Sequence, residues 1–150
     1  MKRHPSLQSL SHDHHHGLVQ ARRLREAAAA EADLAVVAAD FLAVWTADIQ
    51  PHFRAEEETL FPAFARYGDA HLPPVVRTLL EHVEIRRQVD DLARELAAGT
   101  LTPATLEGIG TQLQAHIRYE EAVVFPLIEA ALPEAALADL ATRLHPVEPD

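Results

Sequence analysis

The sequence predicts an all-α protein: an antiparallel, up-down-up-down four-helix bundle followed by a short C-terminal helix. Alanine and leucine are abundant, glycine is scarce at 5 residues, and long stretches lack β-branched runs, which favours helices. Apolar residues recur at alternating spacings of three and four, the period of a helix with one buried face. With 150 residues and no linker composition, the chain fits a single domain, residues 1–150.

Proline, glycine and capping residues divide the chain into these helices. The expected ranges are Leu7 or Leu10 to Ala30, Leu34 to Arg66, Pro73 to Gly99, Thr102 to Leu132, and Glu134 to Leu144. Asp33 is a candidate N-cap for the second helix, and Gly68 follows its end. Pro51 lies inside the second helix, so it should kink the helix just before His52.

Composition excludes several classes of function. Because the chain has no cysteine, it can form neither disulfides nor zinc–thiolate sites. Its formal net charge of −10 argues against nucleic acid and anionic membranes as partners, since both require a basic surface. No signal-peptide core or run of about 20 apolar residues is evident. We therefore expect a cytoplasmic protein, and an acidic bundle with apolar faces can also form a homodimer.

One metal-ligand pattern occurs twice, from His52 to Pro62 and again from His116 to Pro126. Histidine, arginine, two glutamates, phenylalanine and proline recur in the same order, 64 residues apart. Histidine and glutamate four positions apart lie on one face of a helix, about 6 Å apart along its axis. Two such pairs that face each other could hold two metal ions.

The helical period places these pairs on the faces expected to point into the core, and adds one histidine from each remaining helix. The expected inward positions, helix by helix, are Leu7, Leu10, His14, Gly17, Ala21, Leu24 and Ala28; Leu42, Trp45, Ile49, His52, Glu56, Thr59 and Ala63; Leu72, Val75, Leu79, His82, Arg86, Val89, Ala93 and Leu96; and Leu106, Ile109, Leu113, His116, Glu120, Val123, Leu127 and Ala130.

Four histidines and two glutamates in one core require compensation, because a buried carboxylate costs several kcal/mol unless its charge is balanced. They could share protons in a polar network, but bound cations balance them better. Imidazole and carboxylate ligands without thiolate suit iron, manganese, zinc or nickel. The candidate metal ligands are His14, His52, Glu56, His82, His116 and Glu120.

Some neighbouring residues leave alternatives open. His14 belongs to the run from His12 to His16 and is favoured because it shares the apolar face of the first helix, with His15 as the alternative. Glu57, Glu58 and Glu121 lie off the inward face and could pair with Arg54 and Arg118. Glu57 and Glu121 recur in both copies, so they could instead support the metal ligands from outside.

The pattern resembles the hemerythrin-like, or HHE cation-binding, domain. The resemblance covers residues 7–131 and implies a four-helix bundle with two non-haem iron ions, bridged by carboxylates and an oxo or hydroxo group. By this resemblance Glu56 and Glu120 would bridge the two irons. His14 and His52 would bind one iron, and His82 and His116 the other.

The sequence departs from the oxygen-carrying hemerythrins at two positions. Those proteins have a second histidine one turn after the equivalent of His82, but Arg86 occupies that position here. They also have an Asp five residues after the histidine that corresponds to His116, whereas here Glu120 follows His116 by four residues. The second iron could then have an open position, or take Glu81, Tyr119 or water as a ligand. Arg86 would either raise the reduction potential as a buried cation or pair with Glu121.

The resemblance implies a protein that binds or reacts with O₂, peroxide or nitric oxide, with roles in sensing, stress defence or iron handling. We expect a metal-binding or redox module more than a classical enzyme, because the sequence shows no substrate pocket and no catalytic residues beyond the metal ligands. The alternative is a bundle stabilised by zinc or another divalent metal that binds a protein partner.

Overall fold

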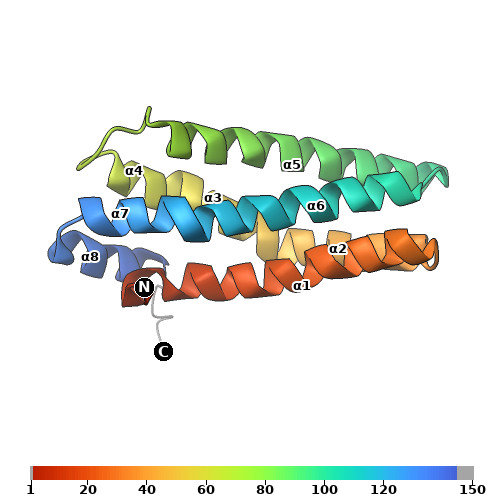
Figure 1. Ribbon diagram of the computed structural model, residues 1–150, viewed down its shortest axis with the longest axis horizontal. Helices are drawn as coiled ribbons and strands as arrows, with labels where there is room; N and C mark the ends of the chain where they lie inside the picture. The colour runs from red at the N-terminus through yellow and green to blue at the C-terminus, as the bar shows by residue number, and fades with distance from the viewer. Residues whose placement is uncertain (1, 145–150) are drawn as a thin grey trace.

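The computed structural model, described here for residues 2–144, is an antiparallel bundle of four long helical arms with a fifth helix across one end (Figure 1). Neighbouring arms run in opposite directions, and the described residues contain no strand. The predicted all-α bundle is confirmed. The helical elements are η1 (Pro5–Leu7), α1 (Gln8–Ala30), α2 (Leu34–Val44), η2 (Trp45–Ile49), α3 (Gln50–Ala55), η3 (Glu56–Leu60), α4 (Phe61–Phe64), α5 (Pro73–Ala98), α6 (Pro103–Tyr119), η4 (Glu120–Val124), α7 (Phe125–Ala131) and α8 (Glu134–Leu144).

The ends of the helices follow the predicted boundaries closely. Gly99 ends α5 with a φ of 70°, in the left-handed region where glycine carries no steric cost. Asp33 precedes α2 as expected, but its φ is 56° and its side chain accepts no capping hydrogen bond. Helix α4 ends at Phe64, and the Gly68 N–H donates to the Phe64 carbonyl.

Three prolines inside the long arms each follow a π-helical segment. The segments η2, η3 and η4 are five residues long and end one residue before Gln50-Pro51, Phe61-Pro62 and Phe125-Pro126. In each case the residue before proline donates its N–H to the carbonyl five positions earlier. Proline has no N–H and its ring clashes with the carbonyl four positions earlier, so one extra residue in the turn accommodates it.

The π-helical segments correct the predicted core positions beyond each glutamate. After Glu56 the buried residue is Leu60 rather than Thr59. After Glu120 the buried residue is Val124, while Val123 is 38% exposed. A regular period of 3.6 residues fails here because η3 and η4 each insert one residue into the helix.

On α5 the predicted inward face is rotated. Thr78, Ile85 and Leu92 are fully buried, whereas Arg86 keeps 31% of its side chain exposed. The buried positions include apolar Ile85, which is one residue before the arginine. Arg86 therefore lies at the edge of the core and not inside it, contrary to the sequence prediction.

The arm Leu34–Phe64 is apolar over a longer stretch than the sequence prediction allows. By length and composition it could cross a membrane, with a mean hydropathy of 1.3 over its most apolar window. Its inner face nevertheless carries buried His52 and Glu56 as well as core residues such as Phe41 and Phe53. We therefore describe it as an arm of the bundle.

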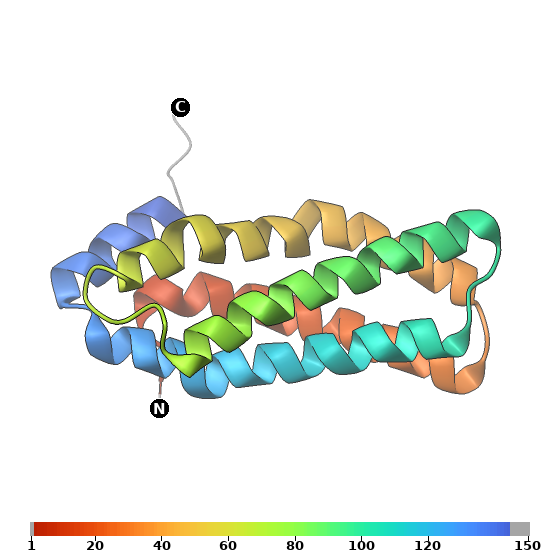
Figure 2. The same cartoon turned by 90° about the horizontal axis from the view of Figure 1, so that it is seen from above.

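The hydrophobic core is divided into two halves by a layer of buried polar side chains. Leu24, Phe41 and Leu106 belong to the half near the α1–α2 and α5–α6 loops. Leu60 and Phe125 belong to the other half, which α8 covers (Figure 2). The polar layer takes side chains from all four arms and lies between the two apolar halves. These halves offer its polar atoms no hydrogen-bond partners.

Candidate metal centre

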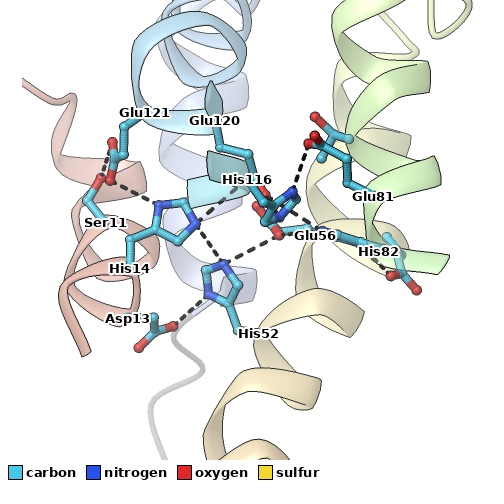
Figure 3. A network of polar contacts seen from close by, with 12 residues as sticks. Ser11, Asp13, His14, His52, Glu56, Glu81, His82, His116, Glu120 and Glu121 are labelled. Atoms are coloured by element: carbon cyan, nitrogen blue, oxygen red, sulfur yellow. Dashed lines mark hydrogen bonds and ion pairs between the residues drawn. The ribbon is translucent and has the colours of Figure 1, made fainter. Parts of the chain in front are cut away.

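All six predicted ligands converge in this polar layer (Figure 3). Each arm contributes: α1 gives one histidine, α5 gives one histidine, and each remaining arm gives a histidine and a glutamate four residues apart. His14 is 3% exposed, whereas His15 is exposed, so the structure places His14 in the cluster. The six residues and their exposures are His14 3%, His52 6%, Glu56 0%, His82 1%, His116 0% and Glu120 0%.

The six side chains form two overlapping groups whose potential ligand atoms lie within 4.8 Å of one another. One group is His14, His52 and Glu56, and the other is Glu56, His82, His116 and Glu120. Glu56 Oε1 lies 3.4 Å from His52 Nε2 and 3.3 Å from His82 Nε2, so this carboxylate stands between the groups. Glu120 contacts both as well, at 2.6 Å from His116 Nε2 and 3.9 Å from His14 Nε2.

Six of the inward atoms lack hydrogen-bond partners although they are close together. Both carboxylate oxygens of Glu56 and of Glu120, and the Nε2 atoms of His82 and His116, are buried without a hydrogen bond. They form no hydrogen bond even though the potential ligand atoms of each group lie within 4.8 Å of one another. Such unpaired groups are costly in a core. A cation within each group would satisfy these atoms together, so the residues fit a metal centre.

A carboxylate outside the cluster fixes the outer nitrogen of every one of these histidines. The Nδ1 atoms contact carboxylate oxygens at 2.7 to 3.1 Å, and the four pairs are His14–Glu121, His52–Asp13, His82–Glu57 and His116–Glu81. If Nδ1 carries the proton that it donates, Nε2 presents its lone pair to the cluster. This is the arrangement by which proteins orient metal-binding histidines.

The Nε2 atoms of His14 and His52 lie only 3.1 Å apart. With both Nδ1 atoms donating to carboxylates, two lone pairs would face each other across this gap. A proton or a metal ion must therefore be shared between the two rings.

Arginines hold three of the four outer carboxylates. Arg86 donates to Glu57 at 2.6 Å, so the predictions that it pairs with Glu121 or lies as a buried cation in the cluster are both wrong. Arg3 holds Glu121 at 2.8 Å, and Arg77 lies 3.3 Å from Glu81. Arg86 occupies the position where the resemblance predicts a second histidine, and it supports His82 indirectly through Glu57.

Two other candidates for the cluster have different partners. Glu81 binds His116 Nδ1 and Arg77 rather than reaching the inner atoms. The ring of Tyr119 lies under the Arg77 guanidinium, 3.7 Å from it. Asp13 contacts His52, although neither the helical period nor the repeated pattern identifies it. Its only sequence signal is its place one residue before His14, which puts it on the side of α1 that faces His52.

Aromatic rings fix the histidines from either side of the layer. Phe53 stacks on His82 with ring centroids 3.9 Å apart and an interplanar angle of 5°. Phe125 stacks on His14 at 5.1 Å and 11°. Packing of this kind restricts ring rotation, so the Nε2 atoms keep their direction without a bound ligand.

The electrostatic field of the cluster attracts positive charge. Burial opposes protonation of His52, but Glu56 and Asp13 outweigh it and raise its pKa to about 10. Burial likewise opposes protonation of His82 and His116, yet the carboxylates that contact them raise both pKa values to about 9. Burial works against ionisation of Glu56, while His52 holds its pKa well below the usual range. Without metal, protons supply the charge that a cation would otherwise supply.

Comparison with known proteins agrees with this geometry. The profile of the hemerythrin HHE cation binding domain matches residues 6–128. The chain belongs to the hemerythrin HHE cation-binding family. No curated protein and no solved structure gave a significant match. The HHE family assignment and the buried histidine–glutamate cluster identify a metal-binding domain.

In this HHE domain a pocket of about 350 Å³ leads to one side of the cluster. His14 and His52 line it together with apolar side chains such as Val44, Ile49 and Ile117. Gly17 also lines it. A side chain at this position would clash with Ile117, because its Cβ would lie 2.7 Å from Ile117 Cδ1. The His14/His52 group can therefore be reached from outside.

Replacing Asp13 with asparagine tests the outer carboxylates of this HHE domain. Asp13→Asn keeps the shape but removes the charge that holds His52 Nδ1, so we expect metal affinity at the His14/His52 group to fall by about 10- to 100-fold. Competition with a chelator measures it. Asp48→Asn, an exposed carboxylate on the same pocket, is the control and should change little. Equal affinities of the two variants would contradict the role of Asp13.

Proposed function

We propose that the protein holds two non-haem iron ions in this cluster and binds O₂, peroxide or nitric oxide there, as a redox or sensing module. One observation carries the proposal: all four histidines have Nδ1 engaged by a carboxylate, while their Nε2 atoms converge with two shared glutamates. Nitrogen and oxygen donors without sulfur suit iron. Two irons would supply one-electron redox steps and a coordination position for the small ligand.

The surrounding residues prepare the cluster for two cations. Six carboxylates and three arginines accompany the four histidines, which leaves a net charge of −3 when the histidines are neutral. Two divalent ions would more than balance this charge. Glu56 and Glu120 would bridge them, and the outer carboxylates would hold the protons on Nδ1 and aim the Nε2 lone pairs at the ions.

Metal analysis of freshly purified protein, combined with its absorption spectrum, tests the proposal. We expect about two irons per chain and near-ultraviolet bands that change when azide is added. A colourless protein that contains zinc, and that gains no such bands after aerobic loading with iron, would overturn the proposal in favour of a structural metal bundle.

We further propose that the small ligand enters through the pocket at the His14/His52 group. Val44→Trp would fill that pocket, so azide association with the iron-loaded protein should slow by at least about tenfold. The iron content should not change, because Val44 is neither a predicted ligand nor a hydrogen-bond partner of one. Val36→Trp, on the same helix but 61% exposed, is the matched control. Unchanged association in Val44→Trp would show that the ligand enters elsewhere.

A further inference from the structure

Two histidines outside the cluster face each other on the surface of α1. His12 and His16 are exposed and one helical turn apart, and their Nε2 atoms lie 3.1 Å apart. Their rings meet edge to face, with centroids 4.7 Å apart. Two imidazole nitrogens converging at this spacing can chelate one transition-metal ion, and an exposed pair can do so without displacing a buried group.

The pair lies at the outer part of the pocket that reaches the cluster. His12 and His16 line the same pocket as His14 and His52. Two exposed imidazoles and two predicted metal ligands therefore line one pocket.

Asp13 connects the two parts of this pocket. It also lines the pocket, its side chain is 51% exposed, and its Oδ2 lies 3.0 Å from His52 Nδ1. The other three outer carboxylates each contact an arginine, but within residues 2–144 no arginine or lysine pairs with Asp13. Negative charge at the pocket is thus left available to a mobile cation.

We propose that His12 and His16 form a capture site for a divalent transition-metal ion, from which the ion passes along the pocket into the buried centre. This inference rests on the proposed metal centre and assigns a role to the histidine run that the six predicted ligands leave unexplained. A weak site suits this role, because two imidazoles bind an ion but release it to the larger set of ligands inside. The pair raises the local metal concentration at the entrance.

Loading of metal-free protein with limiting cobalt(II) tests the proposal. Cobalt retained after rapid desalting at timed intervals reports the buried centre, because a weak surface ion is lost during desalting. The variant is His12→Gln/His16→Gln, which keeps polar bulk at the pocket but removes both imidazoles. His15→Gln is the matched control, since His15 is exposed on the same helix and does not line the pocket.

We expect loading to slow several-fold in the double variant, with the same final cobalt content as the wild type and the His15→Gln protein. Calorimetric titration of protein with a filled centre should show one further weak equivalent in wild type and control, absent from the double variant. Equal loading rates, or a weak equivalent that persists in the double variant, would overturn the proposal. A wild-type protein that retains no cobalt would instead contradict the buried metal centre, which separates the two failures.

Discussion

Replacing Glu56 with alanine is expected to remove both metal ions from the protein. Glu56 belongs to both groups of ligand atoms and lies within 3.4 Å of histidines from each. Losing it should therefore weaken binding by more than the roughly 10- to 100-fold that an outer partner costs. The measurement is metal content per chain after dialysis, with circular dichroism to show that helicity is retained.

Glu58→Ala provides the matched control for this variant. Glu58 is two residues away on the same segment, its side chain is 68% exposed, and it pairs only with Arg54 at 3.7 Å among the described residues. Its removal should leave metal content unchanged. Wild-type metal content in Glu56→Ala would contradict the centre proposed here. Glu120→Ala should also lose most of the metal, because Glu120 contacts His82 and His116 directly.

The helical period was sufficient to bring the cluster together from the sequence. Histidines 14, 52, 82 and 116 each fall on an apolar face, and a bundle of four arms has one interior for those faces to share. The repeated pattern supplied both glutamates. Whether these residues ligate a metal stays a prediction, but their convergence follows from spacing alone.

The period failed where the backbone is not an α-helix. Each π-helical segment shifts the register by one residue, which is why Leu60 and Val124 are buried in place of Thr59 and Val123. Pro51 predicts a kink, but a kink and an inserted residue have the same sequence signal, and Pro62 and Pro126 follow inserted residues as well. Two of these segments begin at the ligand glutamates themselves, so the irregular turns help to set the direction of those carboxylates.

The outer carboxylates were only partly predictable. Glu57 and Glu121 recur in both copies of the pattern, which suggested a supporting role. Asp13 and Glu81 have no such repeat, because they lie on α1 and α5 and reach across to histidines of other arms. Such contacts depend on how each helix is rotated about its axis. On α5 the buried face lies about one residue from the predicted one, so these contacts could not be derived from the spacing.

Removal of the metal is expected to lower the thermal stability of the protein strongly. Free metal at 100 times its Kd stabilises a folded protein by about 2.7 kcal/mol for each site, so two sites contribute about 5 kcal/mol and roughly 10 to 20 °C in Tm. Thermal unfolding with and without chelator measures this difference. Glu56→Ala should show no such response, while Glu58→Ala should respond like the wild type. A wild-type Tm that chelation does not change would contradict the buried centre.

The difference in Tm between metal-loaded and metal-free protein should grow as the pH rises. In the metal-free protein the pKa of His52 is raised to about 10, and those of His82 and His116 to about 9, from a normal value of 6.5. Their protonation therefore contributes stability fully below pH 6.5, and this contribution is lost as pH rises through about 9 to 10. Bound metal replaces these protons, and its affinity rises over the same range because fewer protons compete. The Tm of metal-free protein should fall between pH 7 and 9 while that of the loaded protein changes less, and a gap that narrows over this range would contradict the displacement of histidine protons by metal.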